Sequence, residues 1–322
     1  MSGKQNILIT GANGYLGSHI TELLQNSGHN IYALCLEIFQ EQKRWEKLGI
    51  KIIQGDITQT SCLTKLHDYS IDTIIHLVSL NHFDSEKDTE LALKVNVLPT
   101  WNILKHFSGK GLKKFIYFSS QQVYGRIPAI EIDESYKPEP VNSYGLTHLQ
   151  SEQIVNLYNA TTEVEAINVR LSNSYGAPVF KQNSCWWLVV NDLCQSAYKN
   201  QKIKLLSDGS PQRDFIHVSD VAGAVKVLVE NNSLTTNLFN ISSGHTLTIL
   251  ELATMVQKVY NNRYHSAILI VGSNNATFDL KENKTQKPKY TIKNLAIINA
   301  GLVLNTELES GINKLFNYLE KN

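Results

Sequence analysis

The residues whose spacing carries the clearest chemical meaning lie near the N-terminus. Three glycines occur in Gly11-Ala-Asn-Gly14-Tyr-Leu-Gly17, after an apolar segment at 6–10 and before a segment of helical periodicity at 15–26. Gly11 permits a tight turn, Gly14 lets the backbone approach a pyrophosphate, and Gly17 lets the helix pack close to the sheet. The helix N-terminus adds amide donors. The spacing predicts a dinucleotide site, whose loop also contains Asn13, Tyr15 and Leu16.

The residues after the second apolar segment indicate which dinucleotide binds. An acidic side chain there accepts hydrogen bonds from the ribose hydroxyls of NAD, whereas an arginine pairs with the 2′-phosphate of NADP. Cys35 takes the usual acidic position, Glu37 follows two residues later, and the next arginine is Arg44. NAD is therefore the expected cofactor, with NADP left open. Asp56, followed by Ile57, is expected either to meet the adenine edge or to cap its own loop.

The first half of the chain alternates short β-branched segments with longer amphipathic ones, and these elements must position the glycine loop. Alternation of this kind is typical of a parallel sheet with helices on both faces. The predicted fold class is therefore α/β, a Rossmann-like doubly wound parallel sheet. Strands are expected at 6–10, 30–34, 51–54, 73–78, 114–118 and 165–170, and helices at 15–26, 89–107 and 144–158.

After Asn173 the alternation ends, although the sequence offers neither a linker nor an internal repeat. Helices are expected at 186–198 and 249–260, a strand returning to the sheet at 239–241, and a polar surface loop at 274–289. This pattern predicts a smaller, discontinuous C-terminal lobe. The predicted boundaries are 1–172 plus about 214–242 for the dinucleotide-binding domain, and about 173–213 plus 243–322 for the lobe.

Composition excludes several classes of protein. The 322 residues carry 30 Lys plus Arg against 29 Asp plus Glu, so there is no electrostatic footprint for nucleic acid. No apolar stretch approaches the ~18 residues that a membrane-spanning helix needs, and the few residues before Ile7 are too short for a signal peptide. The four cysteines have no metal-binding spacing and are expected to be free, buried thiols. A cytoplasmic protein without metal is expected. The cysteines are Cys35, Cys62, Cys185 and Cys194.

Several ordered segments resemble the extended short-chain dehydrogenase/reductases of the nucleotide-sugar epimerase/dehydratase type, over essentially the whole chain. The resemblance implies an NAD(P)-dependent enzyme for a nucleotide-activated sugar, and it extends the cofactor site to Leu77, Val78 and Asn96. The segments are the glycine motif, Gly55-Asp56, His76-Leu-Val-Ser79, Asn96, Ser119-Ser120-Gln-Gln-Val-Tyr124-Gly125, Tyr144, Arg170-Leu-Ser-Asn173-Ser-Tyr175-Gly176 and Asp208-Gly-Ser-Pro-Gln-Arg213-Asp-Phe-Ile-His217-Val-Ser-Asp220.

The resemblance also implies a catalytic set in which Ser120 and Tyr144 stand at the family's Ser and Tyr positions. In the family, a lysine four residues after the Tyr holds the nicotinamide ribose and lowers the Tyr pKa. Here that position is His148, whose imidazole is shorter and mostly neutral at pH 7. Two interpretations stay open. Either His148 replaces the lysine in a working enzyme, with Tyr144 and His148 both contacting cofactor, or the chain is a catalytically silent dinucleotide-binding or regulatory protein.

The residues after Ser120 restrict the reaction that the resemblance implies. The family's 4,6-dehydratases have an Asp-Glu pair there as acid and base, whereas this chain has Gln121-Gln122. An amide cannot transfer a proton, so 4,6-dehydration is not expected. Hydride transfer, most often at C4, is expected instead. A 4-epimerase, a 4-ketoreductase and a 4-dehydrogenase all stay open.

The resemblance further implies a nucleoside diphosphate sugar as the bound partner. Asn173, Asn183 and Arg213 map to the residues that hold the diphosphate, and Gln121 is expected beside the sugar. An arginine fork suits phosphate oxygens. The family commonly pairs two helices across a two-fold axis, which implies a homodimer through a four-helix bundle of 91–107 and 144–158.

Overall fold

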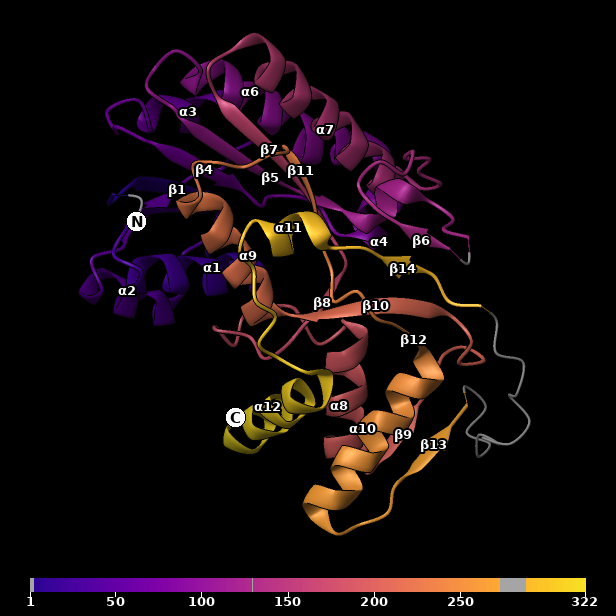
Figure 1. Ribbon diagram of the computed structural model, residues 1–322. Helices are drawn as coiled ribbons and strands as arrows, with labels where there is room; N and C mark the ends of the chain where they lie inside the picture. Colours follow the sequence, from indigo (N-terminus) through magenta and orange to yellow (C-terminus); the bar gives the residue numbers. More distant parts are fainter. Residues whose placement is uncertain (1–2, 129, 273–287) are drawn as a thin grey trace.

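The computed structural model describes residues 3–128, 130–272 and 288–322. Its centre is a parallel sheet of seven strands in the order β3-β2-β1-β4-β5-β7-β11 (Figure 1). The predicted doubly wound parallel sheet is confirmed, and 239–241 does return to it. The strands are β1 (Asn6–Thr10), β2 (Asn30–Cys35), β3 (Lys51–Gln54), β4 (Thr73–His76), β5 (Lys114–Ser120), β7 (Glu165–Leu171) and β11 (Leu238–Ile241).

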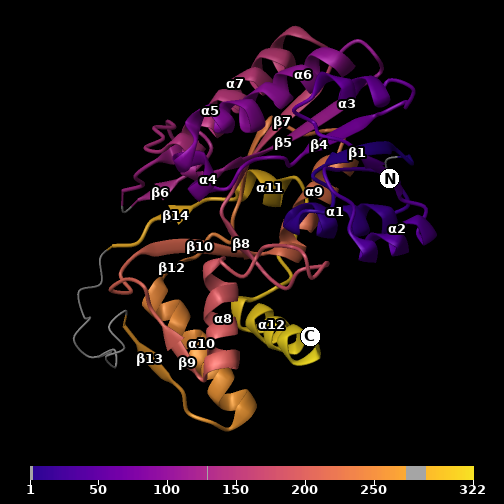
Figure 2. The ribbon, with the colours of Figure 1, turned by 180° about the vertical axis from the view of Figure 1, so that it is seen from behind.

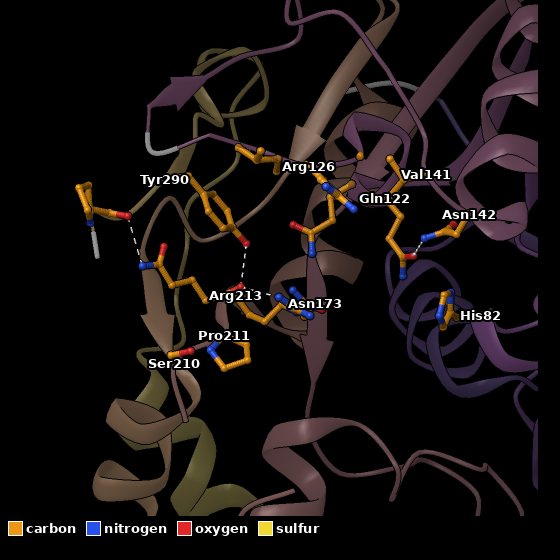
Figure 3. Close-up of a pocket in the computed structure, with 15 residues that line it drawn as sticks. His82, Gln122, Arg126, Val141, Asn142, Asn173, Ser210, Pro211, Arg213 and Tyr290 are labelled. Atoms are coloured by element: carbon orange, nitrogen blue, oxygen red, sulfur yellow. Dashed lines mark hydrogen bonds between the residues drawn. The ribbon is translucent and has the colours of Figure 1, made fainter. Parts of the chain in front are cut away.

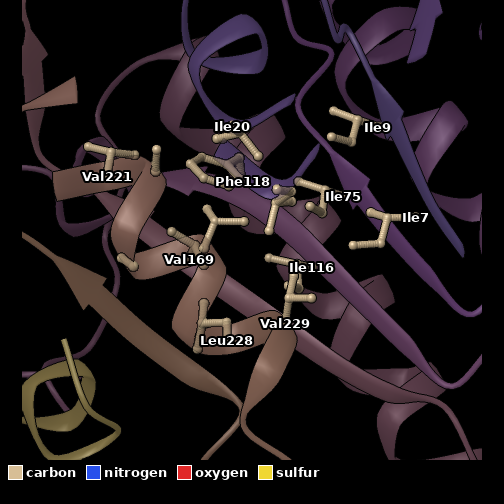
Figure 4. Close-up of a cluster of buried hydrophobic side chains, with 14 of the residues drawn as sticks. Ile7, Ile9, Ile20, Ile75, Ile116, Phe118, Val169, Val221, Leu228 and Val229 are labelled. Atoms are coloured by element: carbon tan, nitrogen blue, oxygen red, sulfur yellow. The ribbon is translucent and has the colours of Figure 1, made fainter. Parts of the chain in front are cut away.

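Both faces of the sheet are covered, because successive side chains of a strand point to opposite sides. In β1, Ile7 and Ile9 join one apolar cluster and Leu8 joins the other. Figures 1 and 2 show α3, α6 and α7 on one face, and α1, α9 and α11 on the opposite face. Figure 4 shows the second of these layers, where Ile20 and Val221 pack on the sheet. The helices are α1 (Tyr15–Asn26), α2 (Lys43–Lys47), α3 (Thr60–Lys65), α6 (Leu98–Phe107), α7 (Ser143–Thr161), α9 (Val218–Glu230) and α11 (Leu295–Asn299).

The expected single helix at 89–107 is divided. After α4 (His82–Lys87), the chain forms α5 (Thr89–Ala92), then a π-helical turn at Leu93–Val97, and then α6. Pro99, in the first turn of α6, has no backbone N–H to offer the preceding turn. The π-turn places Asn96 in the interior, where its side-chain oxygen accepts a hydrogen bond from Leu80 N at 2.7 Å. This bond fixes the loop that follows β4.

A second group of elements forms a smaller lobe beside the main sheet. Its apolar cluster includes Leu193, Val256 and Phe316 from three helices. The expected helix at 186–198 begins later, at Val189, and the expected loop at 274–289 lies mostly outside the described residues. Although α11 falls within the range predicted for the lobe, its Ile297 packs in the core of the main sheet. The lobe's elements are β8 (Asn173–Tyr175), α8 (Val189–Asn200), β9 (Lys202–Lys204), β10 (Gln212–His217), β12 (Thr246–Thr248), α10 (Ile249–Tyr264), β13 (Leu269–Val271) and α12 (Leu308–Lys321), and β6 (Glu131–Ile132) pairs with β14 (Thr291–Ile292) beside it.

Two smaller expectations concern thiols and membranes. All four cysteines are buried and unpaired, as predicted. Within the three described ranges, no helix combines the length and the apolar character that crossing a bilayer would require.

Candidate active site

The glycine loop joins β1 to α1, and two of its glycines are required by geometry. Gly11 has a φ of +68°, in the left-handed region that favours glycine. A β-carbon at Gly17 would lie 2.1 Å from the Gly11 carbonyl oxygen, so only glycine lets α1 start this close to the turn. Gly14 caps α1 without a side chain, which leaves the first amides of the helix available to an anion. This geometry fits a dinucleotide pyrophosphate.

Two asparagines hold the loop in place. The Asn13 side chain donates to the Glu37 carbonyl oxygen at 2.7 Å and to Gln42 Oε1 at 2.9 Å. The Asn13 carbonyl oxygen in turn accepts from Asn183 Nδ2 at 2.7 Å. Asn183 was expected beside the diphosphate, but the structure buries it against the glycine loop, and it is not among the residues that line the cavity described below. The sequence reasoning missed Gln42, which is also buried.

The adenine end of the predicted site contains a carboxyl group that caps its own loop. Asp56 Oδ1 accepts from Thr58 N at 2.9 Å and from Thr58 Oγ1 at 2.7 Å. The guanidinium of Arg44 pairs with Glu22 at 2.7 Å and lies over the Phe180 ring at 5.0 Å. Because Arg44 is already engaged, this end of the site favours NAD over NADP.

The other residues predicted to contact the cofactor take several positions. Tyr15 Oη donates to the Gly176 carbonyl oxygen at 3.1 Å, across to the smaller lobe. Leu16 packs against the main core, and Ile57 is buried in the layer on the opposite face of the sheet. Leu77 and Val78 follow β4 directly and are partly buried.

The three predicted catalytic residues meet at the carboxyl end of β5. Ser120 ends that strand, and Tyr144 and His148 lie one turn apart on α7, with ring centroids 4.4 Å apart. The Asn142 side chain caps α7 by accepting from Gly145 N at 2.7 Å. Burial raises the pKa of the Tyr144 phenol, and the hydroxyl groups of Ser120 and Ser79 act in the opposite direction. Tyr144 therefore holds its proton at neutral pH.

His148 differs from a lysine in its charge as well as its length. It is 2% exposed, and burial lowers its pKa to about 4, so the imidazole is neutral at pH 7. Its Nδ1 lies 2.8 Å from Tyr117 Oη, whereas its buried Nε2 has no hydrogen-bond partner in the described part of the chain. An unpartnered buried nitrogen beside Tyr144 fits a ligand hydroxyl. Together with the uncapped start of α1, it makes the residues present suitable for a dinucleotide.

A cavity of about 810 Å³ opens beside this catalytic set (Figure 3). Its lining includes Gln121 and Arg126, which follow β5 in the chain, together with Asn173, Arg213 and Tyr290. Among the residues that the structure describes, no Asp or Glu lines the cavity, and neither guanidinium forms an ion pair. The cavity therefore carries a positive potential suited to an anionic ligand.

The structure brings together three of the four predicted substrate residues: Gln121, Asn173 and Arg213. The sequence reasoning missed Arg126, Tyr290 and His82. Arg126 follows the motif ending in Gly125, and that adjacency was the available signal. The His82 ring lines the cavity and meets the Tyr144 ring edge to face, with centroids 6.3 Å apart.

Comparison with known proteins agrees with this geometry. The model of the NAD dependent epimerase/dehydratase family matches residues 7–242. A putative UDP-glucose 4-epimerase of Methanocaldococcus jannaschii is 26% identical over 253 residues, which cover 78% of this chain and 81% of that protein. The dTDP-D-glucose 4,6-dehydratase of Dictyostelium discoideum is 24% identical over 272 residues, covering 78% of this chain and 61% of that longer protein.

A solved structure shares the fold. MoeE5 in complex with UDP-glucuronic acid and NAD superposes with a TM-score of 0.79 at 23% identity, over 98% of this chain and 99% of that one. The match to the family model confirms the resemblance predicted from the sequence, and because that family is NAD dependent it also confirms NAD as the cofactor. The glycine loop, the Ser-Tyr pair and the family match over most of the chain lead to one conclusion: this protein belongs to the NAD dependent epimerase/dehydratase family.

Proposed function

We propose that this protein is an enzyme that oxidises or reduces C4 of a nucleoside diphosphate sugar, as a 4-epimerase, a 4-ketoreductase or a 4-dehydrogenase. One observation carries the proposal. Ser120 and Tyr144 meet beside a cavity that is lined by two guanidinium groups and, in its described part, by no carboxylate. NAD, when bound, would supply a hydride acceptor and NADH a hydride donor.

The side chains of the protein would transfer the proton of the sugar hydroxyl. During oxidation Tyr144 would accept the proton of a sugar hydroxyl in its phenolate form, and during reduction the phenol would return that proton, while Ser120 would hydrogen-bond the same oxygen. The raised pKa keeps Tyr144 in the phenol form, which is the form that reduction requires. His148 is neutral and adds no charge that would favour the phenolate. The site therefore favours proton donation by Tyr144, the step that completes a reduction.

The diphosphate would lie between the sheet and the smaller lobe. Arg213 offers a charged fork, of which Nη1 donates to the Gln212 carbonyl oxygen at 2.7 Å. Asn173 donates to the Asp214 carbonyl oxygen at 2.9 Å, which orients its amide at the cavity wall. Arg126 supplies a second positive charge to the lining of the cavity. Charged donors of this kind form short hydrogen bonds to phosphate oxygens.

The side chains at the sugar end argue against 4,6-dehydration, the reaction for which one of the relatives is named. Gln122 Oε1 accepts from Asn142 Nδ2 at 2.9 Å, and Gln121 Oε1 is buried without a partner in the described residues. Both amides can hydrogen-bond sugar hydroxyls, but neither can exchange protons with C5 or C6.

The decisive experiment incubates the purified protein and NAD with UDP-glucose, UDP-glucuronic acid or dTDP-glucose, and follows the products by NMR. A C4 epimer or a 4-keto sugar is expected from at least one of them, or reduction of a 4-keto sugar with NADH. Tyr144→Phe should lower turnover about 10³-fold without weakening NAD binding. Loss of water from the sugar would contradict the proposal. Binding of both ligands without turnover would favour the silent, regulatory alternative.

We further propose a homodimer. The helices α6 and α7 expose large apolar side chains, among them Leu98 at 52%, Trp101 at 39% and Leu157 at 46%. Leu104, in the same stretch, is fully buried against the sheet and does not contribute. Light scattering at micromolar concentration should give twice the chain mass, and Trp101→Glu should lower it to the mass of one chain.

A further inference from the structure

Tyr117 occupies a position that the proposed reaction does not use, yet it bonds directly to His148. It lies in the middle of β5, is 1% exposed, and its Oη is 2.8 Å from His148 Nδ1. Hydrogen bonds between two such buried side chains are protected from competing water, so they orient both groups. Tyr117 therefore fixes one nitrogen of the imidazole.

The neighbours of the pair leave it uncharged. His76 is the register partner of Tyr117 on β4, and its Nδ1 is held by Thr10 Oγ1 at 2.7 Å. Burial lowers the pKa of His76 to about 3. Glu152, one turn beyond His148 on α7, is paired with Arg170 at 2.7 Å and accepts from Ser119 at 2.6 Å. The two charges of that ion pair thus neutralise each other, and the Tyr144 ring packs edge to face on the imidazole.

The position of Nδ1 determines what Nε2 can do. The two nitrogens of an imidazole flank one carbon and their in-plane hydrogen-bonding directions diverge, so a bond from Nδ1 to Tyr117 leaves Nε2 directed away from that hydroxyl. Nε2 is buried and has no partner among the described residues. Either tautomer leaves it with hydrogen-bonding capacity, as a lone pair or as an N–H. A buried polar atom without a partner is costly, and a bound hydroxyl group would remove that cost.

We propose that Tyr117 is a positioning residue that holds the neutral His148 ring so that Nε2 meets a ribose hydroxyl of the bound dinucleotide. A lysine would reach such a hydroxyl with a flexible, charged chain. A histidine side chain is shorter, so its ring must be held in one orientation for Nε2 to reach the hydroxyl, and Tyr117 would provide that orientation. The proposal requires NAD binding alone, and it depends on the proposed sugar chemistry only where turnover is measured.

The test compares Tyr117→Phe with Tyr124→Phe by calorimetric titration with NAD. Tyr124 is a matched control, because it is equally buried and its Oη bonds to Asn240 at 2.7 Å, far from His148 along the chain. Tyr117→Phe should weaken NAD binding about five- to tenfold, and Tyr124→Phe should leave it within about twofold. Unchanged NAD affinity in Tyr117→Phe would overturn the proposal.

A double-mutant cycle separates positioning from a general loss of stability. In a His148→Lys background, Tyr117→Phe should change NAD affinity less than about twofold, since a lysine needs no aiming. An equal effect in both backgrounds would show that Tyr117 acts only through the fold.

A measurement on the wild-type protein covers the case in which Tyr117→Phe does not fold. The ¹⁵N NMR signal of His148 Nε2 should move when NAD is added, while Nδ1 should move little. If the Nε2 signal stays unchanged with bound NAD, the proposal is wrong. If NAD shifts it but no sugar nucleotide is turned over, the inference stands and the proposed function fails.

Discussion

The two sides of the candidate site are built in different ways. The glycine loop is held by backbone geometry and by the Asn13 and Asn183 side chains, whose amides bond to other parts of the protein. The Tyr144–His148 side is held by ring contacts, and it leaves a buried nitrogen of His148 without a partner in the described residues. The shape of the first side is fixed by bonds within the protein, whereas the second side keeps a buried polar atom without a partner among the described residues.

The two sides should therefore be sensitive to different kinds of mutation. The glycine loop needs positions without a β-carbon, so adding a side chain there should prevent the loop from binding the dinucleotide. A buried set of neutral rings is sensitive to a polar group left without a partner, because the interior does not solvate it. Three predictions test this contrast.

The largest effect is expected at the glycine loop. A β-carbon at Gly14 would lie 3.1 Å from the Gly11 carbonyl oxygen, a distance that a small shift can relieve. A valine side chain there would still occupy pyrophosphate space, so Gly14→Val should lower NAD affinity at least about 100-fold while the fold persists. Calorimetry and circular dichroism measure both properties. Gly223→Ala, in α9, is the control, since its β-carbon would have an ordinary contact at 3.7 Å. NAD binding by Gly14→Val at the wild-type affinity would show that the dinucleotide lies elsewhere.

A smaller effect is expected in the cavity. Arg213→Gln should weaken UDP-sugar binding about tenfold, because one charged fork to phosphate is lost, and should leave NAD binding unchanged. The matched variant Arg126→Gln tests the second guanidinium of the cavity. Titrations at low and high salt should show a smaller salt dependence in Arg213→Gln than in the wild type. An Arg213→Gln variant with undiminished affinity would place the diphosphate away from this residue.

The smallest effect is a dependence of stability on pH. The folded pKa of His148, about 4, lies below the ordinary value of 6.5, so the folded state disfavours the protonated ring. The unfolded chain then binds more protons between these values, and the free energy of unfolding should fall as pH drops from about 6.5 toward 4. Chemical denaturation at several pH values should show a shallower fall for His148→Gln. His76, whose pKa is about 3, adds to the same trend. An identical slope in the variant would mean that His148 is not buried as described.

Some sequence predictions were accurate because their causes are local. The strands and α1 follow from apolar periodicity, and the positions of Gly11 and Gly17 follow from their order between a strand and a helix. The divided helix around Asn96 was missed, since a π-turn depends on the bond from Leu80 N to a side chain sixteen positions away. Asn183 was expected at the diphosphate, but its partner is the Asn13 carbonyl oxygen, 170 residues distant.

The sequence by itself determined the fold class, the glycine loop, and the types of residue at positions 120, 144 and 148, because each depends on neighbours within a few residues of the chain. The tertiary structure alone decided how those residues work. It placed Tyr117 against His148, gathered Arg126, Arg213 and Tyr290 around one cavity, and buried the imidazole deeply enough to keep it neutral. These outcomes depend on the distance and burial of groups far apart in sequence, and burial sets both the pKa of a side chain and the cost of leaving it without a partner.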